Sequence, residues 1–209
     1  MIKVMEAGRL KLAVLASGRG SNFDALGEAI ERRELSADIK LLISDKKDAP
    51  ALQKAQKREI EAHFINPRDY KSKDEYEMDI LKKLHEHDID LLVLAGYMRL
   101  VGRVLLESFK FRIINIHPAL LPSFTGLHAQ KQAVDYGVKF SGVTVHIVDE
   151  GMDTGPIIMQ AAVPVYQDDD EDSLAARILV EEHKIYWQSL QLFAEGRVWI
   201  DGRKVIVSP

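Results

Sequence analysis

The sequence contains no cysteine, which excludes disulfide bonds and thiolate metal ligands. It also lacks any run of about 18 apolar residues, the length that a transmembrane helix needs. Its start, MIKVMEAGRLKL, has no continuous apolar core of the kind found in signal peptides. Positive charge is not in excess, because 28 basic residues stand against 32 acidic ones, for a net charge of −4. We therefore expect a soluble, cytoplasmic protein that binds neither membranes nor nucleic acid.

What the sequence does contain is enough apolar material for a sizeable core, with 46% hydrophobic residues in a chain of 209. Strands are predicted at 10–16, 37–44, 62–65, 90–96, 111–116, 141–148 and 156–165. Helices are predicted at 22–33, 49–58, 72–87, 128–137 and 172–196. Strand and helix alternate over the first hundred residues. This alternation predicts an α/β fold, a Rossmann-like, open, twisted and mostly parallel sheet with helices on both faces.

Two details of this pattern concern the helix starts and the chain ends. Ser21 or Asn22 is expected to cap the helix at 22–33, and the sequence S-x-x-E at 72–75 predicts a capping box. Residues 197–207 read as a possible hairpin that turns at Asp201-Gly202. We expect one domain over 1–209, with 1–9 as an N-terminal extension.

A glycine-rich turn, LASGRGSN at 15–22, joins the first strand to the first helix. Ligands of open parallel sheets bind beyond the carboxyl ends of strands, and helix N-termini with accessible amides bind phosphate. The dinucleotide fingerprint would need a third glycine where Phe23 stands, and no Lys-Ser/Thr pair follows. The turn therefore predicts either a mononucleotide-type phosphate site or simply a tight strand-to-helix connection.

Three polar residues, Asn115, His117 and Asp153, follow the later strands and could meet where strand ends converge. An amide can donate a hydrogen bond to an oxyanion, and an imidazole moves protons near neutral pH. A carboxylate orients the imidazole and is expected to raise its pKa. The trio itself contains no Ser or Cys nucleophile. The trio therefore favours direct attack of an amine on a carbonyl carbon through a tetrahedral intermediate.

Other interpretations of these histidines remain open at this point. His117 could simply end a strand, and His146 alternates with apolar neighbours as an ordinary strand residue would. A zinc site built from His117, His128 and Asp153 is conceivable. However, the sequence has no H-x-x-x-H or H-E-x-x-H pattern to support it, and we expect no metal.

Five segments stand in the order in which one known family carries them: GRGSN at 18–22, LAGYMRLV at 94–101, NIHPALLPSFTGLHAQKQA at 115–133, GVTVHIVDEGMDTGPII at 142–158 and EEHKIY at 181–186. The chain resembles the phosphoribosylglycinamide formyltransferases in these segments, which span nearly its whole length. The resemblance implies the formyltransferase fold. It also implies an enzyme of purine biosynthesis that transfers a formyl group from 10-formyltetrahydrofolate, as co-substrate, to the amine of glycinamide ribonucleotide. Oligomeric state is left open.

The resemblance also implies roles for individual residues. Gly20, Ser21 and Asn22 would hold the ribonucleotide phosphate, and Glu182 would contact the ribose. Asn115 would bind the formyl oxygen, His117 would be the acid–base group, and Asp153 would orient and charge it. The implied folate-binding residues are Lys73 (in place of a more usual arginine), Met98, Arg99, Leu100, Val101, Asn115, Val148, Asp149, Glu150, Gly151 and Met152.

Two departures from the family pattern, at Arg19 and at Phe124-Thr125, do not touch the implied catalytic trio. The nearest alternative is a 10-formyltetrahydrofolate hydrolase, in which water replaces the amine. Such relatives carry an extra amino-terminal domain, and only about ten residues precede the first strand here. A transfer-RNA formyltransferase would need a further carboxy-terminal domain. A non-catalytic nucleotide-binding module would not need the trio, and the incomplete glycine fingerprint disfavours a nicotinamide dehydrogenase.

Overall fold

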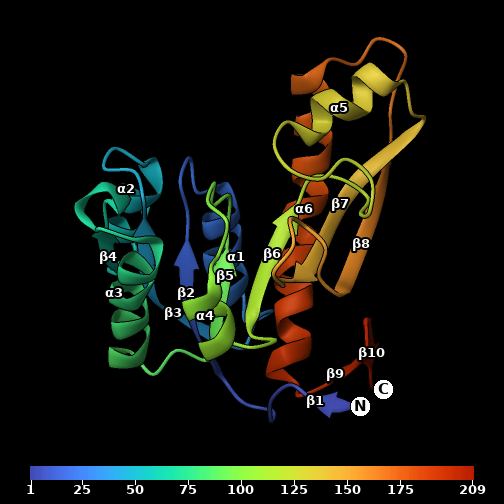
Figure 1. Cartoon of the computed structure of the whole chain (residues 1–209). Helices are drawn as coiled ribbons and strands as arrows, with labels where there is room; N and C mark the ends of the chain where they lie inside the picture. The colour runs from blue at the N-terminus through green and yellow to red at the C-terminus, as the bar shows by residue number, and fades with distance from the viewer.

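Seven strands form the central sheet of the protein, described by a computed structural model of residues 1–209 (Figure 1). Their order across the sheet is β4-β3-β2-β5-β6-β7-β8. The strands that run parallel are β2 (Leu10–Leu15), β3 (Ala37–Ser44), β4 (Glu61–Phe64), β5 (Leu91–Leu94) and β6 (Ile113–His117). The antiparallel strands β7 (Phe140–Ile147) and β8 (Ile157–Pro164) complete the sheet beyond β6. The predicted mostly parallel α/β sheet is therefore confirmed.

Helices cover both faces of this sheet. On one face lie α1 (Ser21–Glu31), α2 (Pro50–Lys57), α5 (Ala129–Tyr136) and α6 (Glu171–Ala194). On the other face lie α3 (Lys73–Glu86) and the short α4 (Arg103–Ser108). None of these helices combines the length and the apolar content that a membrane span requires.

The helix starts correct one expectation and confirm half of another, because the Glu75 carboxylate that would complete the predicted capping box accepts from the Lys71 amide instead of the Ser72 amide. Ser21 and Asn22 do not cap α1, because its N-cap is Gly20, a left-handed residue without a side chain. Ser72 does cap α3, since its hydroxyl accepts a hydrogen bond from the Glu75 amide at 3.1 Å. Asp170 and Ser173 form a complete capping box at the start of α6. The uncapped start of α1 leaves its first amides without side-chain partners.

The side chains of β6 alternate between two apolar cores, as a strand of period two requires. Ile114 and Ile116 pack on the face covered by α6, whereas Ile113 packs on the α3 and α4 face. Asn115 and His117 therefore point to the same side as Ile113. The polar side chains near the end of β6 therefore all lie on the face of the sheet that α3 and α4 cover.

A separate small sheet gathers both ends of the chain. β1 (Ile2–Lys3) pairs antiparallel with β9 (Val198–Asp201), which pairs in turn with β10 (Lys204–Val207). The predicted hairpin is confirmed, but its two-residue turn is Gly202-Arg203, one residue later than expected. Figure 1 shows both termini together at the end of α6.

Candidate active site

The loops that follow β2 and β5 lie side by side, because the strand order of the sheet reverses between these two strands. The Ser17 amide after β2 donates to the Gly96 carbonyl after β5 at 3.0 Å. Such a topological switch point is where open α/β sheets bind ligands. The glycine-rich turn and the Met98–Val101 segment both start from this crevice, as the sequence predicts.

The glycine-rich turn is shaped to leave amides accessible. Gly20 has a φ of +70°, and a Cβ atom there would lie 2.9 Å from the Ala51 Cβ, so only glycine fits without strain. The first hydrogen bond into α1 runs from the Asp24 amide to the Gly20 carbonyl at 3.1 Å. The amides of Ser21 and Asn22 therefore remain available to an anion at the positive end of the helix.

Glu182 of α6 reaches this turn from a distant part of the sequence. Its Oε2 accepts a hydrogen bond from the Asn22 side-chain amide at 2.7 Å, and it is only 9% exposed. Burial raises the pKa of Glu182, although the Asn22 bond and the charge of Arg19 oppose the rise. The Asn22 Oδ1 atom is buried without a partner. The four predicted ribonucleotide residues, Gly20, Ser21, Asn22 and Glu182, are thus brought together.

The three predicted catalytic residues also lie together. His117 Nδ1 is 3.4 Å from Asp153 Oδ2, and Asn115 lies two residues before His117 on the same face of β6. Asp153 is held in place by the Gly126 amide, which donates to its Oδ2 at 2.8 Å. The loop after His117 and the loop after β7 therefore meet over the end of β6.

The protonation of His117 differs from the sequence prediction. Its Nε2 lies 2.8 Å from the Phe124 carbonyl oxygen, which can only accept, so Nε2 carries the proton and Nδ1 faces Asp153. Burial lowers the pKa of His117, and this effect outweighs the opposing influence of the Phe124 carbonyl and of Asp153. Asp153 does raise the pKa of His117, as expected, but burial of the imidazole outweighs this contribution and the net pKa is lowered.

Asp153 itself stays ionised. Burial alone would raise the pKa of its carboxyl, but the nearby His146 imidazole, the hydrogen bond from the Gly126 amide and the neighbouring His117 imidazole outweigh burial and lower it. The site thus holds a carboxylate beside an imidazole that gives up its proton readily.

His146 is a buried residue of β7 with both ring nitrogens hydrogen-bonded, as its interpretation as a strand residue expects, and it also belongs to this cluster. Its Nδ1 lies 3.0 Å from the Ile147 carbonyl and carries the proton, so its Nε2 accepts from the Asn115 amide at 3.1 Å. The same Nε2 is 3.7 Å from Asp153 Oδ1. The alternation in VTVHI places His146 on the same face of its strand as Thr144, and the β6–β7 register sets it opposite Asn115.

Thr144 is a second residue that the sequence interpretation missed. It pairs with His117 across β6 and β7 and is fully buried. Its hydroxyl donates to the Ala119 carbonyl at 2.7 Å and accepts from the Leu121 amide at 3.1 Å. It therefore fastens the segment that leaves the strand directly after His117.

The predicted folate-binding segments flank the trio. Met98 and Leu100 expose 60% and 59% of their surface, while Val101 and Val148 pack on the same apolar cluster beneath α3 and α4. The loop at 149–152 is ordered by Asp149, whose Oδ1 accepts from the Gly151 amide and from the Thr154 hydroxyl. Two apolar side chains thus stand exposed beside a fixed backbone.

Lys73 lies at the edge of the same crevice. It is the first residue of α3, it is exposed, and a Cβ atom on Gly102 would lie 2.7 Å from the Lys73 Cε. Its ammonium group therefore sits next to the end of the Met98–Val101 segment. Arg99 of that segment stacks on the Tyr76 ring, with the guanidinium carbon 5.6 Å from the ring centre.

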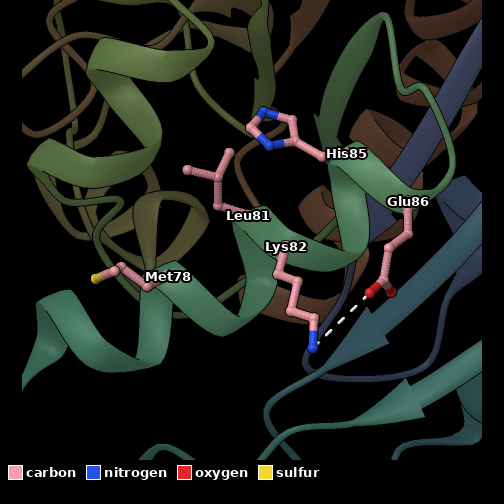
Figure 2. Close-up of a pocket in the computed structure, with 5 residues that line it drawn as sticks. All are labelled: Met78, Leu81, Lys82, His85 and Glu86. Atoms are coloured by element: carbon pink, nitrogen blue, oxygen red, sulfur yellow. Dashed lines mark ion pairs between the residues drawn. The ribbon is translucent and has the colours of Figure 1, made fainter.

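Two further features lie outside this cluster. His128 pairs with Glu171 at 3.1 Å, and no group of three or more potential ligand side chains is arranged to hold a metal ion. A shallow pocket of ≈ 540 Å³ lies on α3 and is lined by Met78, Leu81, Lys82, His85 and Glu86 (Figure 2). Lys82 and Glu86 pair with each other across 3.9 Å there, so this pocket presents no uncompensated charge.

Comparison with known proteins gives one consistent result. Residues 10–190 match the formyl transferase family. The phosphoribosylglycinamide formyltransferase of Bacillus subtilis (strain 168) is 44% identical over 176 residues, which cover 84% of this chain and 90% of that protein. The trifunctional purine biosynthetic protein adenosine-3 of Drosophila melanogaster is 42% identical over 200 residues, 95% of this chain but only 15% of its own length. Among solved structures, glycinamide ribonucleotide transformylase 1 from Symbiobacterium toebii superposes with a TM-score of 0.94 at 44% identity, covering 96% of this chain and 94% of that one.

Proposed function

Because this chain belongs to the formyl transferase family, we propose that it transfers a formyl group from 10-formyltetrahydrofolate to the amine of glycinamide ribonucleotide, in purine biosynthesis. The observation that carries the proposal is the cluster of Asn115, His117 and Asp153, in which His117 contacts Asp153 and the Phe124 carbonyl rather than a hydroxyl nucleophile. This arrangement suits direct transfer between two bound substrates, since neither imidazole is hydrogen-bonded to a Ser or Thr hydroxyl that it could activate as a nucleophile.

In the proposed first step the substrate amine attacks the formyl carbon and negative charge grows on the formyl oxygen. One N–H of the Asn115 amide is bonded to His146, which leaves the second free to donate to that oxygen. Since β6 is packed from behind by α6, the amide is held rigidly as the charge develops. Loss of one such donor typically lowers kcat by about 10²–10³.

In the second step the tetrahedral intermediate breaks down and the folate nitrogen leaves. That anilinic nitrogen is a poor leaving group until it is protonated, so a strong acid near neutral pH is useful. The lowered pKa of His117 makes its imidazolium such an acid, and the Asp153 carboxylate stabilises the charge while the proton is held on Nδ1. The proton comes from the attacking amine.

The two substrates are assigned to the two sides of the switch-point crevice. The ribonucleotide phosphate would bind the amides of Ser21 and Asn22 beside Gly20, with Glu182 near the ribose. The pterin would lie between Met98–Val101 and Val148–Met152, with Lys73 at the rim. The folate co-substrate is thus placed between the ribonucleotide turn and the catalytic strand.

We further propose that residues 1–209 act as one formyltransferase unit. The N-terminal strand β1 pairs with β9, and Val198 and Ile200 of β9 belong to the same apolar cluster as α1 and α6. The cytoplasmic location stays a prediction from the sequence.

The proposal is tested by following the release of tetrahydrofolate from 10-formyltetrahydrofolate with and without glycinamide ribonucleotide. Release that depends on the ribonucleotide is expected, since the amine is the attacking group. Equal release in its absence would support the hydrolase instead. No release under either condition would point to a non-catalytic module.

A matched pair of histidine variants sharpens this test. His117→Ala should abolish the release, whereas His128→Ala should retain it, because His128 is exposed and contacts only Glu171 among charged groups. His117 ends β6 and His128 lies in the loop that follows it, so a general defect of this loop would affect both variants.

A further inference from the structure

Ser17 stands at the junction of the two loops assigned to the two substrates. Its hydroxyl accepts a hydrogen bond from the Met98 amide at 2.9 Å, and its own amide donates to the Gly96 carbonyl at 3.0 Å. The next residue, Gly18, is the first glycine of the glycine-rich turn. One residue thus connects the start of the ribonucleotide turn to the first residue of the folate segment.

Asp45 fixes the direction of the Ser17 hydroxyl. It follows β3, is only 6% exposed, and its Oδ1 accepts the Ser17 hydroxyl proton at 2.6 Å. A hydroxyl has one proton to donate, and that proton is taken by the carboxylate. The lone pairs of the Ser17 oxygen are therefore left for the Met98 amide. Hydrogen bonds to a charged acceptor are short and strong, so this orientation is held firmly.

The folate segment has little else of its own to hold Met98 in place. The Met98 side chain is 60% exposed, whereas Tyr97 and Val101 on either side of it pack on the apolar cluster. The Ser17 bond is the contact that holds the Met98 backbone itself, since its amide donates to the Ser17 hydroxyl. Three residues before Met98, the Ala95 amide donates a hydrogen bond to the Leu15 carbonyl of β2 at 2.9 Å.

We propose that Ser17, oriented by Asp45, is a positioning residue that fixes the Met98–Val101 segment against the glycine-rich turn and so sets the distance between the two bound substrates. The inference rests on the proposed function, because it assigns the folate to that segment. A misplacement of about 1 Å between reacting groups can cost about 10²-fold in rate. The Ser17 hydroxyl would therefore affect turnover without touching the reacting atoms.

Ser17→Ala is compared with a matched control, Ser44→Ala. Ser44 is also a small hydroxyl residue at a strand end next to Asp45 and is fully buried, but its hydroxyl bonds only to Lys46. We expect Ser17→Ala to lower kcat about 10-fold and to weaken the binding of tetrahydrofolate, measured alone by calorimetry. Ser44→Ala should leave both values near those of the wild type. The Tm of the two variants should be similar.

A second pair of variants separates hydroxyl orientation from charge. Asp45→Asn keeps an acceptor oxygen for the Ser17 hydroxyl and should retain most of the turnover, whereas Asp45→Ala should behave like Ser17→Ala. The inference is overturned if Ser17→Ala matches Ser44→Ala in both kcat and tetrahydrofolate affinity. A wild-type protein that shows no ribonucleotide-dependent release would instead refute the proposed function, and that assay is done first.

Discussion

At the scale of the residue, burial rather than a neighbouring charge sets the proton affinity of His117. Its side chain is 6% exposed and Asp153 lies 3.4 Å from its Nδ1, yet the pKa of the imidazole is lowered. In water an adjacent carboxylate would raise this pKa. Here the free energy lost when the imidazolium is removed from solvent exceeds the free energy gained from its attraction to Asp153. His117 is therefore neutral in the free protein at pH 7.

The Asp153→Asn variant should move the pH profile of the reaction toward acid. The charge of Asp153 raises the pKa of His117, so its removal lowers that pKa further below 6.5. The fall of kcat/KM at low pH, caused by protonation of His117, should then occur at a lower pH, together with a reduced maximum. Rates measured between about pH 5 and 8 check this.

Asp135→Asn is the control for that experiment, because Asp135 is exposed on α5 and pairs only with Lys131. Its profile should coincide with that of the wild type. A shift of the acid limb of Asp153→Asn toward higher pH, or no shift, would contradict the assignment of that limb to His117.

Sequence reasoning found part of this site and missed part for a definable reason. Asn115 and His117 are two residues apart on a strand, so local spacing alone put them on one face. The approach of Asp153 depends on a loop held by the Gly126 amide, which no local pattern shows. The bond between His146 and Asn115 was not predicted, because the two residues lie 31 positions apart and meet only through strand register.

At the scale of the element, α6 supports the site from behind the sheet through Tyr186. This side chain is buried, and its hydroxyl lies 2.7 Å from the Leu94 carbonyl and 3.1 Å from the Ile114 carbonyl. Burial raises the pKa of Tyr186 well above its usual value, so the hydroxyl remains a donor. The end of β5 and the first half of β6 are thereby tied to one helix, directly before Ala95 and Asn115.

Tyr186→Phe should lower the free energy of unfolding by about 1–3 kcal/mol, because two buried carbonyl groups lose this donor. Unfolding by urea, followed by circular dichroism, measures the change. Tyr136→Phe is the matched control: Tyr136 is 80% exposed, and its loss should change stability by less than about 0.5 kcal/mol. Equal stability of the two variants would contradict this role for Tyr186.

The elements themselves were largely predictable, and the misses have common physical causes. Periodicity predicted the bounds of the sheet strands and of the longer helices to within a few residues. It missed α4, the 3-10 helix η1 (Pro67–Asp69) and β1, which have six, three and two residues and are too short to show a period. The expected side-chain cap of α1 failed because a left-handed glycine ends the preceding turn.

At the scale of the whole molecule, the order of the strands was beyond sequence reasoning. Alternation of strand and helix indicates parallel neighbours, but not that β5 pairs with β2 on the side away from β3. The antiparallel pair β7 and β8 follows from their connection, because a parallel crossover needs a dozen or more residues and usually a helix. The reversal of strand order is what creates the crevice.

Removal of residues 1–4, so that the chain starts at Met5, tests the small terminal sheet. The deletion eliminates the pairing of Ile2 with Ile200 and the bond from the Val4 amide to the Val198 carbonyl. A loss of about 1–2 kcal/mol is expected, which lowers the Tm by about 2–8 °C for a chain of this size. Scanning calorimetry measures the Tm, and turnover at 25 °C should be unchanged. A large loss of turnover with a normal Tm would contradict the separation of this sheet from the site.

The small terminal sheet holds both chain ends together, which determines where further domains could be joined to this unit. Both chain ends leave the molecule at the foot of α6, whereas the parallel strands point their carboxyl ends, and the crevice, the opposite way (Figure 1). A neighbouring domain attached at either terminus would therefore be tethered behind the catalytic mouth and leave it open to diffusing substrates. This geometry is compatible with the Drosophila melanogaster relative, in which the matching segment is 15% of a trifunctional chain. The position of the two termini, away from the crevice, therefore allows this unit to be joined to other domains without covering its site.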